Sequence, residues 1–158
     1  MTALGFVGIG TMGAPMVQCM ARQGYAPLIH DANTEAASEV GAKAGLSVAA
    51  SLTKVGQHAE IVILMLPNSA IVKEVCLGDG GLVQSMRQGG LIIDMSSSDP
   101  IETRKLGASL LERGITLVDA PVSGGLRKAV AGTLAIMLGG NDAAAMDRVT
   151  PLLETMGK

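Results

Sequence analysis

The stretch that decides the fold is Gly8-Ile9-Gly10-Thr11-Met12-Gly13, in which three glycines are spaced as G-x-G-x-x-G. It directly follows the apolar run Leu4–Val7 and opens a segment of helical periodicity, with Met16 and Met20 on one face. The spacing gives each glycine a mechanical role: a tight turn, a close approach of the backbone to a ligand, and the packing of helix on strand. Free N–H groups and the helix dipole favour an anion at such a turn, so the stretch predicts a diphosphate site.

Beyond the glycine stretch, short apolar runs alternate with helical segments, which is typical of βα units around a parallel sheet. We expect strands at Leu4–Val7, Pro27–His30, Leu46–Val48, Ile61–Leu66, Leu91–Met95, Thr116–Ala120 and Thr133–Leu138. We expect helices from about Met12 to Gln23, Thr34 to Ala44, Asn68 or Ser69 to Val75, Ser98-Asp99 to Arg113, and Asn141 or Asp142 to Met156. The prediction is an α/β fold of the Rossmann type, with a doubly wound, mostly parallel sheet in one domain over residues 1–158.

Composition argues against several classes of function. The 158-residue chain has a net charge of -2 and only Phe6 and Tyr25 as aromatic residues, so it lacks the basic surface and stacking side chains of nucleic-acid-binding proteins. It contains no run of about 18 apolar residues that would span a membrane. Its N-terminus lacks the basic region of a signal peptide, so we expect a cytoplasmic protein. Cys19 and Cys76 have no partners at metal-ligand spacing, so we expect two small buried side chains and no metal site.

Asp31 ends the second expected strand and follows Gly13 at close to the ~20-residue spacing of a ribose-binding acid. Its carboxylate would accept hydrogen bonds from the 2′-hydroxyl of an adenosine and would repel a 2′-phosphate. The following Ala32-Asn33 supplies no arginine for that phosphate. The sequence therefore favours NAD over NADP, with Asp31 and Asn33 as candidate contacts. The alternative is that Asp31 only caps the turn at Asn33-Thr34.

Four blocks of sequence, in order along the chain, resemble the β-hydroxyacid dehydrogenases. The first is Gly5-Phe6-Val7-Gly8-Ile9-Gly10-Thr11-Met12-Gly13-Ala14-Pro15-Met16. The others are Met65-Leu66-Pro67-Asn68-Ser69, Asp94-Met95-Ser96-Ser97 and Asp119-Ala120-Pro121-Val122-Ser123-Gly124-Gly125. The resemblance covers essentially the whole chain. Within the family, the chain looks most like the tartronate semialdehyde reductases and is also similar to the 3-hydroxyisobutyrate dehydrogenases.

The resemblance implies roles for residues that follow the strands. Met65, Leu66 and Pro67 would line the nicotinamide-ribose side of a cleft, and Ser97 would contact the cofactor near its nicotinamide. Ser123-Gly124-Gly125 would hold the carboxylate of a small substrate with a hydroxyl and backbone N–H groups. From the residues alone, plainer interpretations stay open: Pro67 as a strand terminator, Ser97 as a turn residue, and the two glycines as a turn before a helix.

The resemblance also implies parts that these 158 residues do not contain. The catalytic lysine of the family, which donates and removes the alcohol proton, lies on a helix beyond position 158, and Lys158 is not in that motif. We therefore expect no catalytic residue here. The all-α C-terminal domain of the family is absent too, so we expect a chain cut at a domain boundary and a full-length protein that is a homo-oligomer. Cys19 stands where the family usually has asparagine, and we expect packing consequences only.

Two classes of function follow from the sequence. The first is the NAD-binding domain of an oxidoreductase that interconverts a short 3-hydroxy acid and its semialdehyde, inactive as this chain alone. The second is a dinucleotide-binding module that performs no reaction.

Overall fold

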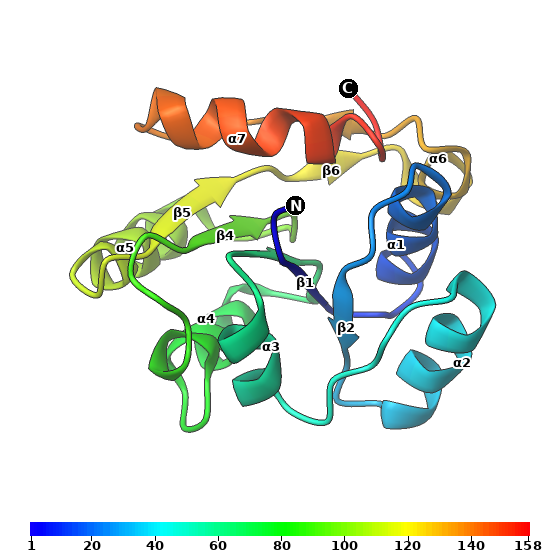
Figure 1. Ribbon diagram of the computed structural model, residues 1–158. Helices are drawn as coiled ribbons and strands as arrows, with labels where there is room; N and C mark the ends of the chain where they lie inside the picture. The colour runs from blue at the N-terminus through cyan, green and yellow to red at the C-terminus, as the bar shows by residue number, and fades with distance from the viewer.

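The computed structural model describes every residue from 1 to 158 and has a parallel sheet at its centre (Figure 1). Five strands pair in the order β2-β1-β3-β4-β5, and every pair is parallel. Their bounds are β1 Leu4–Val7, β2 Leu28–His30, β3 Ile61–Leu64, β4 Leu91–Asp94 and β5 Thr116–Asp119. The chain runs outward from β1 to β2 and then returns to place β3 on the other side of β1. This reversal confirms the predicted doubly wound α/β fold.

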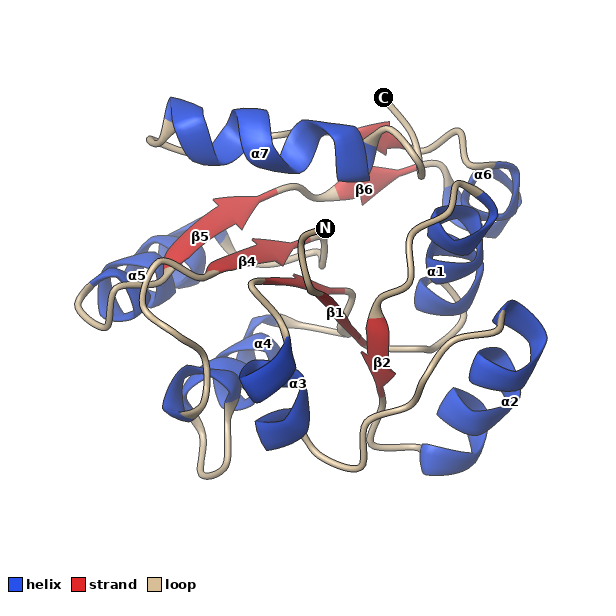
Figure 2. Cartoon of the chain, viewed as in Figure 1, coloured by secondary structure: helices blue, strands red, loops and turns tan.

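Helices cover both faces of the sheet (Figure 2). The larger core packs one face against α1 Gly13–Arg22, α2 Thr34–Ala44, α6 Gly125–Ala131 and α7 Ala143–Leu153. The second core packs the other face against α3 Leu52–His58, α4 Ser69–Leu77, α5 Pro100–Leu111 and the 3-10 helix Leu82–Gln84. Strands β1, β3 and β4 are buried along their whole length, which explains their apolar sequences, with Asp94 at the end of β4 as the one charged residue. None of the helices combines the length and the hydropathy that crossing a bilayer requires.

Side chains cap the helices where the sequence predicted. The helix starts of α4 and α7 had two candidates each, and the structure selects Asn68 and Asp142, whose side chains accept from Ile71 N and Ala145 N. Asp99 caps α5 by accepting from two backbone N–H groups. These caps satisfy donors that the first turn of a helix leaves unpaired. Helix α1 differs, because it has no side-chain cap.

Two of the predicted strands differ from the structure: one is reduced to a single bridge, and the other is shorter and pairs with a different strand. The segment Leu46–Val48 forms only one bridge, between Val48 and Ile29, because its backbone bonds reach a single residue of β2 before the chain turns away. The segment Thr133–Leu138 contains only the short strand β7 Ala135–Ile136, which pairs antiparallel with β6 Val122–Ser123 in a separate two-stranded sheet. Helix α3, capped by Ser51, was not predicted.

Candidate nucleotide-binding site

The predicted nucleotide contacts lie at one edge of the sheet. All five strands are parallel, so their carboxyl ends meet on the same side, where open α/β sheets bind ligands. The glycine loop follows β1, Asp31 follows β2, Met65–Pro67 follows β3 and Ser97 follows β4. The loops after β1 and β3 flank the point where the strand order reverses. The structure therefore brings these residues to the crevice of a doubly wound fold.

The three glycines of the loop differ in what surrounds them. Gly8 has a φ of 101°, and a Cβ there would overlap the carbonyl oxygen of Met65. A Cβ on Gly13 would overlap the carbonyl oxygen of Gly8, so α1 starts in direct contact with the end of the strand. A Cβ on Gly10 would have nothing within 4 Å. Gly8 and Gly13 are thus needed for the turn itself. Gly10 is not required by contacts within the chain, and it faces open space.

The start of helix α1 keeps its backbone donors available. No side chain caps it, and the hydrogen bonds of the structure include none from the N–H groups of Gly10, Thr11 and Met12. Unpaired N–H groups at a helix N-terminus carry a partial positive charge that attracts phosphate. Gly10 and Thr11 are also exposed, so an anion can reach them.

Asp31 lies against the glycine loop. Its Oδ2 accepts a hydrogen bond from Ile9 N at 2.6 Å, and its Oδ1 accepts one from Asn33 N at 2.8 Å. Asp31 therefore caps the turn at Asn33, as the alternative interpretation predicted. It also contacts the glycine loop at Ile9, which that interpretation did not include. The side chain of Asn33 is engaged as the cap of α2, where it accepts from Ala36 N.

The turn after β3 is fixed by two residues that sequence analysis did not select. Ser96 Oγ accepts from Leu66 N at 2.8 Å, and Asp94 Oδ1 accepts in turn from Ser96 N at 2.9 Å. Asp94 Oδ2 accepts from Ser98 Oγ at 2.7 Å. Asp94 and Ser96 are buried, whereas the predicted contact Ser97 is exposed. Polar residues placed directly after a buried strand were the available signal, because such residues must have partners.

The buried carboxylate of Asp94 affects two neighbouring groups. Burial raises the pKa of the Asp119 carboxyl, and the charge of Asp94 on the adjacent strand raises it further. Burial likewise raises the pKa of the Cys76 thiol to about 12, with Asp94 adding to the effect. Cys76 is thus a neutral thiol at neutral pH. Both cysteines are buried, as the sequence predicted, and neither forms a disulfide.

The predicted substrate residues lie on a different element pair. Ser123 ends β6, Gly124 precedes α6 with a φ of 139°, and Gly125 begins that helix with a φ of 66°. All three are exposed. They form the turn between strand and helix that the plainer interpretation described.

Helix α6 is tied to α1 at its far end. Cys19 Sγ donates to the carbonyl oxygen of Ala129 at 3.3 Å. Arg22 Nη2 donates to Cys19 Sγ at 2.9 Å and to the carbonyl oxygen of Val130 at 3.1 Å. Cys19 therefore has more than a packing role, since it links the helix of the glycine loop to the helix of the Ser123–Gly125 turn.

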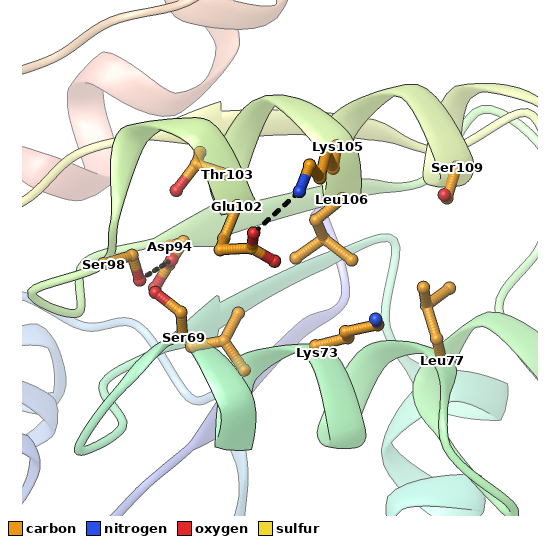
Figure 3. Close-up of a pocket in the computed structure, with 11 residues that line it drawn as sticks. Ser69, Lys73, Leu77, Asp94, Ser98, Glu102, Thr103, Lys105, Leu106 and Ser109 are labelled. Carbon is orange, nitrogen blue, oxygen red and sulfur yellow. Dashed lines mark hydrogen bonds and ion pairs between the residues drawn. The ribbon is translucent and has the colours of Figure 1, made fainter.

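A pocket between α4 and α5 is separate from these residues (Figure 3). Asp94 and Ser98 form one end of it, and the ion pair between Lys105 Nζ and Glu102 Oε1, 3.0 Å apart, lies on its α5 side. None of the predicted nucleotide or substrate contacts lines this pocket. Ser98 bonds to Asp94 at this end of the pocket, so the pocket wall contributes to the support of the β4 turn.

The fold and the glycine-loop geometry define a dinucleotide-binding domain. A family model described as the NAD binding domain of 6-phosphogluconate dehydrogenase matches residues 3–158, and the chain belongs to this family. It is 41% identical over 158 residues to the NAD-dependent L-serine dehydrogenase of Pseudomonas aeruginosa, covering 100% of this chain and 52% of that protein. It is 38% identical over 155 residues to the 2-hydroxy-3-oxopropionate reductase of Escherichia coli, covering 98% of this chain and 52% of that protein.

A solved structure agrees with these relatives. The 3-hydroxyisobutyrate dehydrogenase of Mycobacterium tuberculosis, determined with L-serine, superposes with a TM-score of 0.91 at 36% identity and covers 99% of this chain and 52% of its own. The relatives confirm the resemblance to β-hydroxyacid dehydrogenases. The chain spans about half the length of the curated relatives it matches.

Proposed function

We propose that the chain is the NAD-binding part of an oxidoreductase that interconverts a short 3-hydroxy acid and its semialdehyde. The observation that carries the proposal is the glycine loop beside the uncapped start of α1, with Asp31 in contact with it. The relatives, which include a hydroxy-acid dehydrogenase and a semialdehyde reductase, support the type of substrate.

The residues at the edge of the sheet fit a dinucleotide. Gly10 leaves open space at the loop, and unpaired N–H groups lie beside it, which suits a diphosphate. The lone pairs of Asp31 that are not used by Ile9 and Asn33 suit a ribose hydroxyl. Met65, Leu66 and Pro67 lie across the crevice after β3, where they would line the nicotinamide side, and Ser97 follows β4.

When bound, the nicotinamide supplies or accepts the hydride. The residues of this chain would bind the cofactor and the substrate and orient them. The glycine loop would hold the diphosphate, and the Leu66-Pro67 turn, fixed through Ser96, would position the nicotinamide ribose. Ser123-Gly124-Gly125 would hold the substrate carboxylate through the serine hydroxyl and backbone N–H groups. The group that moves the alcohol proton is proposed to be a lysine outside these 158 residues. Lys158 is not proposed for this role, since it does not lie in the family's lysine motif.

The choice of cofactor is tested by titrating the chain with NADH and with NADPH. Asp31 presents a negative charge where the 2′-phosphate of NADPH would lie, so NADH should bind at least about tenfold more tightly, a difference of about 1.4 kcal/mol. Equal or tighter binding of NADPH would refute this preference.

The reaction is tested on the full-length protein with NADH and either tartronate semialdehyde or methylmalonate semialdehyde. Turnover of one of them supports the proposal, and we expect the 158-residue chain alone to bind NADH without turnover. Tight NADH binding by the full-length protein with no turnover would instead favour a non-catalytic dinucleotide-binding module. We further propose a cytoplasmic location, supported by the two unpaired cysteines, and a homo-oligomeric full-length protein, supported by the family resemblance.

A further inference from the structure

Asp31 makes a contact that ribose binding does not require. Its Oδ2 accepts from Ile9 N at 2.6 Å, and Ile9 is only 2% exposed. The second oxygen accepts from Asn33 N. Both oxygens are thus engaged with backbone donors, and one of these donors lies inside the glycine loop itself, between Gly8 and Gly10.

The contact with Ile9 holds the loop in one arrangement. A hydrogen bond from a backbone N–H to a carboxylate is stronger than one to a neutral acceptor. Because Ile9 is buried, water cannot easily replace the carboxylate if it is removed, and an unpaired buried donor is costly. The neighbouring N–H groups of Gly10, Thr11 and Met12 have no partner in the structure. Asp31 therefore fixes one donor of the loop and leaves the others free for an anion.

We infer that Asp31 is a positioning residue for the diphosphate-binding loop as well as a contact for the ribose. This inference rests on the proposed function, since it concerns the same nucleotide site. A single carboxylate then couples the adenosine end of the site to its diphosphate end. As a consequence, replacing Asp31 to admit NADPH also disturbs the loop on which either cofactor depends.

Electrostatics and loop positioning predict opposite results for a ligand that has no ribose. Removing the charge of Asp31 lowers the repulsion of an anion, so by Coulomb interaction alone inorganic pyrophosphate should bind equally well or more tightly. If Asp31 positions the loop, pyrophosphate should bind more weakly. The sign of the change in pyrophosphate affinity therefore separates the two roles.

The experiment compares three variants of the 158-residue chain by NMR titration with pyrophosphate and with NADH. Asp31→Ala removes both acceptors, whereas Asp31→Asn keeps one oxygen that can accept from Ile9. Asp142→Ala is the matched control, because it removes one carboxylate that caps α7 away from the loop. Thermal unfolding of each variant is recorded in parallel, and amide hydrogen exchange of Ile9 is measured without ligand.

We expect Asp31→Ala to bind pyrophosphate about tenfold more weakly than wild type, with faster exchange at Ile9, and Asp142→Ala to change neither. Asp31→Asn should keep the protection of Ile9 and pyrophosphate affinity within about threefold, while NADH binds more weakly because a charged acceptor for the ribose is lost. If Asp31→Ala does not fold, Asp31→Leu takes its place, because leucine keeps the approximate size of the side chain without an acceptor, and the same results are expected.

Two results would overturn the inference. These are unchanged Ile9 exchange in Asp31→Ala, and pyrophosphate affinity in that variant equal to or above wild type. Each of these leaves the proposed function intact as long as wild type binds NADH. A wild-type chain that binds neither NADH nor pyrophosphate refutes the proposed function instead.

Discussion

Substituting Gly10 with valine should separate binding from folding. A Cβ at Gly10 would have no atom within 4 Å, and Gly10 is not among the glycines with positive φ, so valine fits the folded chain. We expect the free energy of unfolding to change by less than about 1 kcal/mol. The valine side chain would occupy the space beside the unpaired N–H groups of the loop. Losing two hydrogen bonds to a charged diphosphate costs about 3 kcal/mol or more, which lowers NADH affinity at least 100-fold, at about 1.4 kcal/mol per factor of ten.

At Gly8, by contrast, we expect a substitution to reduce the stability of the fold directly. A side chain there meets the carbonyl oxygen of Met65 and must adopt a φ of 101°, so Gly8→Ala should cost about 2–4 kcal/mol. For a chain of this size, this corresponds to a fall in Tm of roughly 5–15 °C. Calorimetric titration with NADH and thermal unfolding compare affinity and stability in Gly10→Val and Gly8→Ala. Gly10→Ala, with a smaller side chain at position 10, is measured beside them. The reasoning is refuted if Gly10→Val binds NADH within about threefold of wild type, or if it unfolds as readily as Gly8→Ala.

Three further predictions concern the support of the site. Because burial raises the pKa of Cys76 to about 12, this thiol should not react with a thiol-specific reagent at pH 7 until urea unfolds the chain; rapid labelling of the native chain would contradict this. The carboxyl of Asp119 has a raised pKa, so the native state binds its proton more tightly than the unfolded state does. Urea unfolding over a pH series should therefore show wild type losing stability relative to Asp119→Asn as the pH rises above 3.8, and a difference independent of pH would contradict the shift. Arg22→Ala should destabilise the chain by about 1 kcal/mol and speed amide exchange in α6, since it removes the guanidinium donor to the carbonyl of Val130 and leaves only Cys19 Sγ there; unchanged α6 exchange would argue against the link.

The sequence predicted the parts of the fold that depend on local chemistry. The apolar runs gave all five strands of the parallel sheet, and capping residues such as Asp99 placed helix starts to within a residue or two. It failed where tertiary contacts decide. The segment Leu46–Val48 has the composition of a strand, but only Val48 reaches the edge of β2. Because the chain reverses direction after α6, the residues after Thr133 run antiparallel instead of extending the parallel sheet. Ala135–Ile136 pair with β6, and Gly139 forms one antiparallel bridge with Asp119 of β5.

The candidate site shows the same division. Spacing alone predicted the glycine loop and Asp31, and the structure adds that Asp31 contacts the loop. The resemblance predicted a role for Ser97, which is exposed. Its buried neighbour Ser96 holds the turn after β3. A hydrogen bond between residues 30 positions apart has no local signal in the chain, so it could not be read from spacing.

The two loops that flank the crevice are each held from the strand outside them. In the order β2-β1-β3-β4, the loop after β1 is held by Asp31 from β2, and the turn after β3 is held by Ser96 from β4. In the glycine loop, Asp31 bonds only to Ile9 N, so the N–H groups of Gly10, Thr11 and Met12 stay unpaired. This arrangement lets a site made largely of backbone groups be rigid before the ligand arrives, which lowers the ordering cost of binding. It also gives the buried Asp94 a structural role that offsets the cost of burying its charge: it orients Ser96, and through Ser96 the turn after β3 that we propose to line the nicotinamide side.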